Sequence, residues 1–152
     1  MKLSTKGHYG LRAMAELARG YGQGPVSLTE IAEAEALSVA YLEQLIAALR
    51  RAGLVTAVRG VHGGYQLARD PKAITVGDVV RVLEGPIAPV ECASEDPEGS
   101  CCDRETECIT RDVWIRMRES IAKVLDSTSL YDVCQSASGG PNKLLYSGDA
   151  DG

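Results

Sequence analysis

Four of the five cysteines in this 152-residue chain lie between positions 92 and 108. They are Cys92, Cys101, Cys102 and Cys108, and seven acidic side chains crowd the same stretch, from residue 91 to residue 107. In a reducing compartment, clustered thiols bind metal or do redox work more often than they form structural disulfides. The stretch has no helix or strand pattern, so we expect an irregular cysteine loop over residues 85–109 that carries metal or thiol chemistry.

Three kinds of chemistry use clustered thiolates: an iron–sulfur cluster, a zinc site and a thiol–disulfide switch. The adjacent pair Cys101 and Cys102 lacks the C-x2-C spacing that is typical of structural zinc sites. Cluster iron takes cysteine thiolates as its protein ligands. The cysteine pattern alone leaves the three alternatives open.

The charged residues are divided unevenly between the two halves of the chain. Residues 1–82 contain ten Lys/Arg and seven Asp/Glu, whereas residues 83–152 contain six Lys/Arg and fourteen Asp/Glu. This asymmetry indicates that the halves face different partners, although a net charge of −5 alone disfavours nucleic acid. No apolar run approaches the roughly 20 residues of a membrane helix, and the start lacks a signal-peptide pattern. We therefore expect a cytoplasmic protein without a membrane partner.

The basic half has the pattern of a winged helix-turn-helix. Apolar spacing predicts helices over residues 2–18, 27–34, 38–52 and 74–83, and Ser27 with Glu30 has the form of a capping box. Residues 54–58 and 65–67 are rich in β-formers and flank a glycine-rich tip, which predicts a hairpin. A long helix is expected over 110–125, then at most a final turn and a disordered tail. The predicted fold is mainly α with a small β-wing.

Such a fold reads DNA with the N-terminal turns of its recognition helix and with its wing. The candidate DNA-binding residues are Ser38, Ala40, Tyr41, Glu43, Gln44, Arg50, Arg51, Arg59, Gly60, His62 and Gly63. Purely structural roles for these residues also fit. Arg50 and Arg51 suit a solvated helix end, Tyr41 suits a core position and His62 suits a loop position without a ligand. A protein-interaction module is therefore the alternative to a DNA-binding protein. An enzyme is not expected, since no nucleophile–base pair, phosphate loop or convincing pair of carboxylates is found.

Three segments carry a resemblance to a known family: KLSTKGHYGLRAM, LSVAYLEQLIAALRRAGLV and VRGVHGGYQLARD. They resemble the IscR/NsrR/RirA family of bacterial winged-helix regulators, over residues 1–133. The resemblance implies a cytoplasmic transcription regulator that dimerises through the long helix after the cysteine loop. It implies that Ser38, Tyr41, Glu43 and Arg59 contact DNA. In many members three cysteines hold an iron–sulfur cluster, but some members lack them.

The resemblance also implies a ligand set. The spacing of Cys102 and Cys108 matches that of the last two cysteine ligands of the family, and Cys92 takes the place of the first. Cys101 is the alternate for Cys102, because it is one residue off that spacing. The cluster type, 2Fe–2S or 4Fe–4S, is left open.

The fourth ligand departs from the family pattern. IscR-like proteins have a histidine three residues after the last cysteine, where this chain has Arg111, and arginine is a very poor ligand. His8 lies where NsrR-like relatives place a ligand supplied by the partner subunit, so we expect His8 of the partner subunit to serve here. An imidazole is a competent cluster ligand. Competing ligands are Cys101, Glu105, Glu107 and solvent, and His8 also suits a simple surface or interface position.

The expected organisation is a winged helix-turn-helix over 1–84, the cysteine loop over 85–109, a dimerisation helix over 110–128 and a largely disordered tail over 129–152, in which Cys134 is an unpaired thiol. The expected function is a homodimeric regulator that binds a pseudo-palindromic operator in double-stranded DNA. It would sense iron, redox or nitric-oxide status through the cluster. The alternative is a cluster-free regulator or interaction module that uses a thiol switch or zinc.

Overall fold

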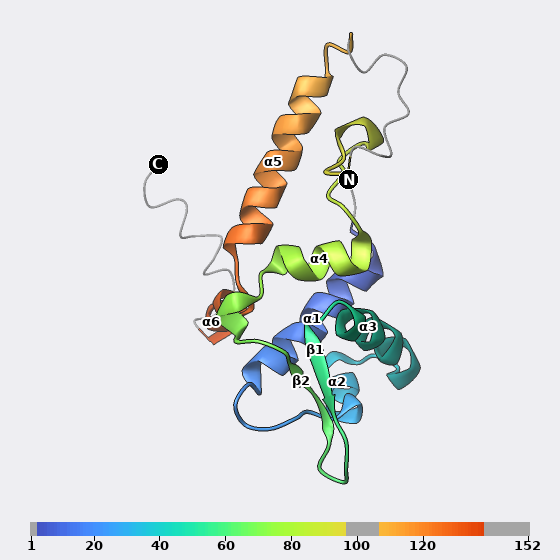
Figure 1. Cartoon of the computed structure of the whole chain (residues 1–152), viewed down its shortest axis with the longest axis vertical. Helices are drawn as coiled ribbons and strands as arrows, with labels where there is room; N and C mark the ends of the chain where they lie inside the picture. Colours follow the sequence, from blue (N-terminus) through green and yellow to red (C-terminus); the bar gives the residue numbers. More distant parts are fainter. Residues whose placement is uncertain (1–2, 97–106, 139–152) are drawn as a thin grey trace.

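The structure is a computed structural model, and it describes residues 3–96 and 107–138. Its elements are α1 (Thr5–Arg19), α2 (Leu28–Glu35), α3 (Val39–Arg51), β1 (Val55–Val58), β2 (Gly64–Leu67), the 3-10 helix η1 (Pro71–Ala73), α4 (Val76–Glu84), the 3-10 helix η2 (Glu91–Ala93), α5 (Arg111–Ser127) and α6 (Leu130–Ser138). In Figure 1, α1 to α4 and the hairpin lie at one end of the molecule, with the hairpin tip pointing away from the helices, and α5 extends in the opposite direction beside η2. The predicted mainly α fold with a β-wing is confirmed.

Short polar motifs start the helices of the helix-turn-helix. The Ser27 hydroxyl accepts a hydrogen bond from the Glu30 amide (3.2 Å), and the Glu30 carboxylate accepts one from the Ser27 amide (3.0 Å), so the predicted capping box is confirmed. α2 ends at Ala36, which adopts the left-handed conformation (φ 54°) and turns the chain sharply. Ser38 then caps α3.

The wing is an antiparallel pair in which Val55 faces Leu67 and Val58 faces Gly64. The Gly63 amide donates to the Gly60 carbonyl (3.0 Å) and closes the turn at the tip. Gly63 is required there, because a Cβ would lie 2.2 Å from the Val58 carbonyl oxygen. On its other side β2 exchanges two backbone hydrogen bonds, each 2.8 Å, between Tyr65 and Val26 just before α2. The wing is thus fastened to the segment before α2 through the tip-side end of β2.

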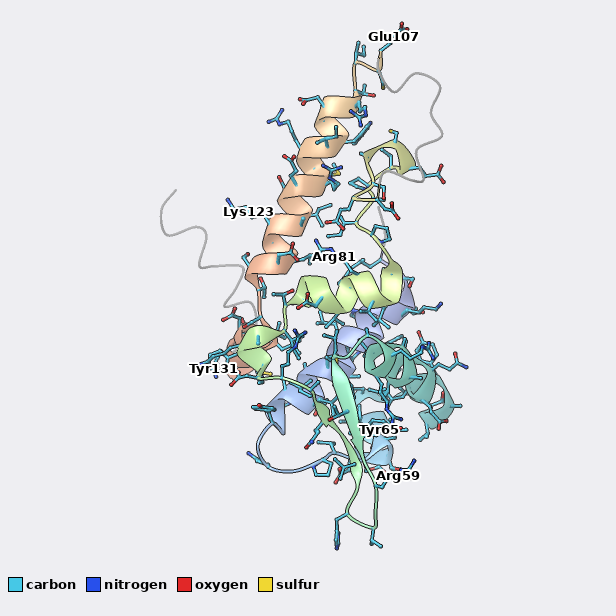
Figure 2. All side chains as sticks on the ribbon, in the orientation of Figure 1. Arg59, Tyr65, Arg81, Glu107, Lys123 and Tyr131 are labelled. Atoms are coloured by element: carbon cyan, nitrogen blue, oxygen red, sulfur yellow. The ribbon has the colours of Figure 1, made fainter. Side chains whose placement is uncertain are left out.

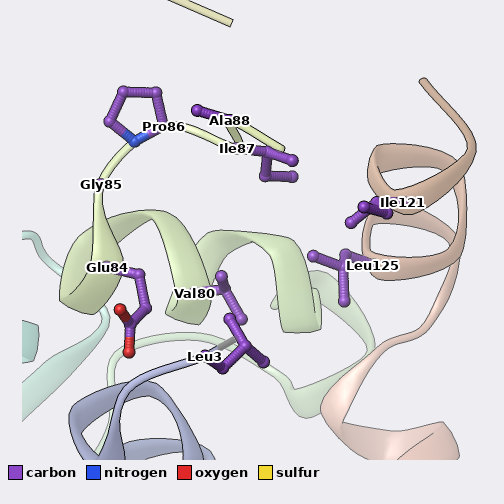
Figure 3. Close-up of a pocket in the computed structure, with 9 residues that line it drawn as sticks. All are labelled: Leu3, Val80, Glu84, Gly85, Pro86, Ile87, Ala88, Ile121 and Leu125. Carbon is purple, nitrogen blue, oxygen red and sulfur yellow. The ribbon is translucent and has the colours of Figure 1, made fainter. Parts of the chain in front are cut away.

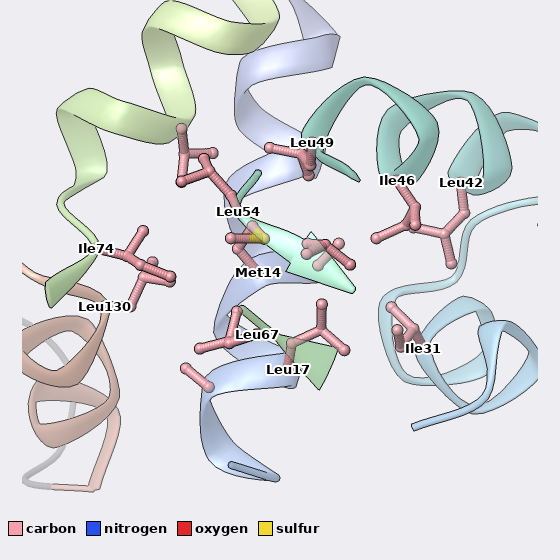
Figure 4. Close-up of a cluster of buried hydrophobic side chains, with 14 of the residues drawn as sticks. Met14, Leu17, Ile31, Leu42, Ile46, Leu49, Leu54, Leu67, Ile74 and Leu130 are labelled. Atoms are coloured by element: carbon pink, nitrogen blue, oxygen red, sulfur yellow. The ribbon is translucent and has the colours of Figure 1, made fainter. Parts of the chain in front are cut away.

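The hydrophobic core fills the space around α1 (Figure 4). Its largest fully buried side chains are Met14, Leu17, Ile31, Leu42, Ile46, Leu49, Ile74, Leu130, Val55 and Val79. No polar or charged residue of the described ranges is buried, so the side chains of this core are apolar and apolar burial is their main stabilising contribution. No helix within those ranges is long and apolar enough to cross a membrane.

The C-terminal region differs from the expected turn and disordered tail, because residues 130–138 form the helix α6. Ser129 and Asp132 cap it reciprocally, with hydrogen bonds of 3.0 and 3.1 Å. Leu130 is fully buried in the core, and its amide donates to the Ile74 carbonyl (2.9 Å). Cys134 is half-buried, and its thiol donates to the Ala15 carbonyl oxygen of α1 (3.6 Å). Residues 139–152 of the expected tail lie outside the described residues.

The buried position of Leu130 predicts that α6 stabilises the whole fold. We expect Leu130→Ala to lower the free energy of unfolding by about 2–5 kcal/mol, because it removes a filled core position. The control is Val61→Ala at the wing tip, where the side chain is 97% exposed and the expected change is below about 0.5 kcal/mol. Urea denaturation of both variants at one protein concentration measures the difference. Equal stabilities would show that α6 is dispensable.

Candidate nucleic-acid interface and cysteine loop

The outer face of α3 carries the predicted base-reading residues. Its inner face is buried through Leu42, Leu45, Ile46 and Leu49. The opposite side chains are Ser38, Ala40, Glu43 and Gln44, and all four are exposed. The Ser38 oxygen accepts from the Tyr41 amide (3.2 Å), which leaves its hydroxyl hydrogen for an outside acceptor. A helix with an exposed polar N-terminal face suits the major groove.

Two positions were expected for Tyr41, an exposed DNA contact or a buried core position, and the structure places it between them. Its ring is half-buried, and its hydroxyl donates to the Thr5 hydroxyl oxygen (3.3 Å) at the start of α1. The Tyr9 ring meets it edge-on, with 6.2 Å between the ring centres. Tyr41 therefore fixes the start of the recognition helix against α1. No sequence signal pointed to Thr5 and Tyr9, because both contacts join residues far apart in the chain.

An open hollow lies between α3 and the wing, and two of the predicted basic residues border it on the α3 side. Glu43, Ala47, Arg50, Arg51 and Tyr65 line this hollow. Arg50 and Arg51 are exposed, as is Arg59 in the wing (Figure 2). None of the three guanidinium groups has an ion-pair partner among the described residues, so each is available to a phosphate.

The wing tip projects beyond the rest of this surface. The turn closed by Gly60 and Gly63 presents two exposed side chains, Val61 and His62. His62 and Val61 also line a shallow hollow against the start of α2. The predicted wing residues are thus at the tip or beside it, and the almost fully exposed Val61 is a wing-tip position that the sequence reasoning did not single out.

Two of the predicted cysteine ligands lie in the described part of the chain. Cys92 is half-buried in η2, and Cys108 precedes the first turn of α5. The Cys108 sulfur lies 3.2 Å from the Thr110 hydroxyl oxygen, and this hydrogen bond, with the backbone amides of Thr110 and Arg111, lowers the pKa of the Cys108 thiol. Its thiolate, the form that binds metal, is therefore favoured.

The remaining ligand candidates are less informative. Cys101, Cys102 and Glu105 lie outside the described residues, and Glu107 is exposed. In the ranges that the structure describes, no three His, Cys, Asp or Glu side chains converge as a metal site would require. By contrast with the lowered pKa of Cys108, burial raises the pKa of the Cys134 thiol in α6.

His8, the predicted ligand from the partner subunit, is exposed on the first turns of α1. Its ring lies beside that of Tyr9, with 5.3 Å between the centres. The neighbouring Gly7 amide donates to the Glu84 carboxylate of α4 (2.8 Å). His8 is thus on a fixed part of the winged helix and faces outward, where another chain has access to it.

The helix after the cysteine loop leaves its apolar side uncovered. No residue of α5 is buried, and Val113, Met117 and Val124 are between 40% and 63% exposed. Ile121 and Leu125 line a mainly apolar hollow with α4 and the segment after it, as Figure 3 shows. An uncovered apolar surface of this kind marks a contact with another protein surface.

Comparisons with known proteins agree with this geometry. The family model for Rrf2, described as an iron-dependent transcriptional regulator, matches residues 3–136. The chain is 50% identical to the transcriptional regulator CymR of Bacillus subtilis over 96% of this chain and 99% of that one. The structure of that protein, described as the global cysteine regulator, matches with a TM-score of 0.77, over 89% of this chain and 97% of that one.

Two further structures extend the comparison. The structure of T. potens IscR matches with a TM-score of 0.75 at 47% identity, over 96% of each chain. Staphylococcus aureus CymR in an oxidized form matches with a TM-score of 0.68 at 44% identity, over 88% of this chain and 96% of that one. These relatives are regulators and not enzymes, so both the family resemblance and the expectation of a non-enzyme are confirmed. The chain belongs to the Rrf2 family of winged-helix transcriptional regulators.

Proposed function

We propose that this regulator is a cytoplasmic homodimer whose affinity for a pseudo-palindromic operator is set by the state of its cysteine loop. The state we favour is an iron–sulfur cluster held by three cysteines. The observation that carries the proposal is the joining of a DNA-reading surface to a loop with four thiols in one Rrf2-family chain. Thiolates are chemically suited to cluster iron, and the same chain has free guanidinium groups for phosphate.

The DNA contacts follow from the exposed surfaces of α3 and the wing. Ser38, Glu43 and Gln44 would meet base edges or nearby phosphates from the first turns of α3. Arg50 and Arg51 would hold the backbone at the other end of the helix. Arg59 would enter the minor groove from the wing, where Gly60 and Gly63 allow close approach. Ala40, Tyr41 and His62 complete the proposed surface.

A second copy of the chain is the proposed cover for α5. The helix has seventeen residues, none of them buried, and its apolar side chains recur along its length. A two-fold pair of such helices would place two recognition helices at a fixed separation, and a dimer reads its half-sites at that separation.

Cys92, Cys102 and Cys108 are the proposed cluster ligands, with Cys101 as the alternate for Cys102. Arg111 begins α5 and does not supply a fourth ligand, so His8 of the partner subunit is proposed for that place. When bound, a cluster would make the site responsive to iron supply, oxidants or nitric oxide. His8 sits next to Gly7, which bonds to α4, so a ligand from this position would join the loop of one subunit to the winged helix of the other.

A thiol switch is the second candidate, and the likeness to CymR favours it. That relative is described as a cysteine regulator, and S. aureus CymR exists in an oxidized form. Cys108 is partly exposed at the edge of the loop, where an oxidant or a second thiol has access. In the thiol switch, two cysteines of the loop would form a disulfide instead of holding a cluster. A zinc site, the third alternative, would make the loop structural and redox-inactive.

Arg59 provides a test of the DNA-binding surface. We expect Arg59→Ala to weaken operator binding and to reduce the slope of log affinity against log salt by about 1, because one cation is lost from the DNA-contacting surface and one fewer counterion is released on binding. The matched control is Lys123→Ala on α5, whose side chain lies far from the wing in Figure 2 and should leave the slope unchanged. Fluorescence anisotropy over a salt series measures both. A wild-type protein without salt dependence would instead support a protein-interaction module.

Cys108 provides a test of the cofactor. We expect protein purified anaerobically to contain iron and sulfide in equal amounts, and Cys108→Ser to lose both together with the cluster absorption. Cys134→Ser is the control and should keep them, because Cys134 bonds to α1 and lies outside the cysteine loop. His8→Ala should alter the spectrum. Wild type that holds neither iron nor sulfide after reconstitution would overturn the cluster, and a diamide-induced disulfide in the loop would then favour the thiol switch.

A further inference from the structure

A single arginine joins three parts of the chain that the proposed function leaves unconnected. Arg81 projects from α4 toward α5 (Figure 2). Its guanidinium donates to both oxygens of Glu95, at 3.0 and 2.7 Å, and to the Asp126 carboxylate at 2.9 Å. These hydrogen bonds hold the pKa of the Glu95 and Asp126 carboxyl groups below their usual values and raise that of Arg81. All three groups are therefore charged and paired at neutral pH.

The partners of Arg81 lie in the cysteine loop and at the C-terminal end of α5. Glu95 is three residues after Cys92, and its carboxylate also accepts from the Ile87 amide (2.9 Å). Asp126 lies in the last turn of α5. Arg118 of α5 donates to the Ser94 carbonyl (3.1 Å), which holds the same stretch from the other side. The segment just after Cys92 in the cysteine loop is therefore bonded to both α4 and α5.

Gly77 of α4 leaves room for the ion pair between Arg81 and Asp126. A Cβ on Gly77 would lie 2.0 Å from the Asp126 carboxylate oxygen and 2.7 Å from an Arg81 nitrogen. Gly77 lies one turn before Arg81 on the same helix. Its φ lies outside the left-handed region, so the glycine serves the approach of the Arg81–Asp126 pair and not a special backbone conformation.

The C-terminal turn of the same helix is also bonded to the start of α1. The Glu84 carboxylate accepts from the Ser4 hydroxyl and from the Gly7 amide at the start of α1. The adjoining Thr5 hydroxyl accepts from Tyr41 of the recognition helix. Arg81 and Glu84 are three residues apart, on one side of α4. Hydrogen bonds on α4 and α1, joined along the backbone of these two helices, thus connect Glu95 of the cysteine loop to Tyr41 of α3.

We propose that Arg81 is a positioning residue that couples the state of the cysteine loop to the orientation of the recognition helix. The inference rests on the proposed function in one respect, namely that the loop has two states that differ in operator affinity. Occupation or oxidation of Cys92 shifts η2 and with it Glu95, and Arg81 passes that shift to α4. Coupling between two sites requires an element that both sites bias, and the Arg81–Glu95 pair supplies it. Because the pair is partly exposed and lies outside the core, its removal leaves the fold intact.

The test measures a ratio of affinities and not an affinity. Full-length Arg81→Gln is compared with wild type on an operator duplex selected by wild type, in two states at one salt concentration. One state is metal-free and reduced, and the other follows anaerobic loading with iron(II) and sulfide or, in a parallel series, oxidation with diamide. We expect the wild-type ratio to be about 5-fold or more, as is typical of allosteric coupling, and the Arg81→Gln ratio to approach 1. Iron, sulfide and the absorption spectrum should match wild type.

Three comparisons separate coupling from simple stabilisation. Glu95→Gln should reduce the ratio as Arg81→Gln does, and the double variant should reduce it no further. Gly77→Ala disturbs the Arg81–Asp126 ion pair without changing a charge, because its Cβ would meet both side chains, and it should also reduce the ratio. Arg19→Gln is the control, because it removes an exposed ion pair with Glu16 that has no link to the loop, and it should keep the wild-type ratio.

The possible outcomes distinguish a failure of the role proposed for Arg81 from a failure of the proposed function. An Arg81→Gln protein that keeps the wild-type ratio, or that loses affinity equally in both states, would overturn the role of Arg81 and leave the proposed function standing. A wild-type ratio of 1 in both series would overturn control by the cysteine loop itself, and the role of Arg81 with it. A failure of the role of Arg81 is therefore seen in the Arg81→Gln variant, and a failure of the proposed function is seen in the wild-type protein.

Discussion

The close approach of α1 and α4 is the constraint on which the other contacts depend. Two glycines of α1 face α4, and a Cβ on Gly10 would lie 2.0 Å from a methyl carbon of Leu83. At Gly7 the missing side chain admits the Glu84 carboxylate, which accepts from the Gly7 amide. Because α1 also contributes Met14 and Leu17 to the centre of the core, its position relative to α4 fixes where α3 and the wing lie.

The molecule separates its two kinds of chemistry in space. The exposed faces of α3 and the wing lie at one end, and η2 with the start of α5 lies toward the other, as Figure 1 shows. Cys92 and Cys108, the loop thiols that the structure describes, therefore lie apart from the surface that would meet DNA. Within one subunit, α4 lies between them and packs against α1, α3 and α5.

Local signals made much of the fold predictable from the sequence. The capping box at Ser27 and Glu30, the apolar stripe of α3 and the glycine-rich hairpin each depend on neighbours within a few residues. Helix α6 was missed, although Ser129 and Asp132 form a capping pair, because a nine-residue helix is unstable alone and forms here through the burial of Leu130. The contacts of Tyr41 with Thr5 and of Arg81 with Glu95 and Asp126 were equally hidden, since they join residues 14 to 45 positions apart and leave no periodic trace in the sequence.

The outer edge of β1 has a consequence for the protein when it is not on DNA. In the described residues β2 is paired on both sides, by β1 and by Val26, whereas β1 is paired only with β2. Its exposed Thr56, Ala57 and Val58 therefore offer a free edge to which a strand from another molecule can add. The shortness of the strand, at four residues, and the positive charge of Arg59 immediately after it both oppose such aggregation. The features that suit the wing to a DNA groove, its shortness and its cation, are thus the same ones that oppose edge-to-edge pairing of the unbound protein.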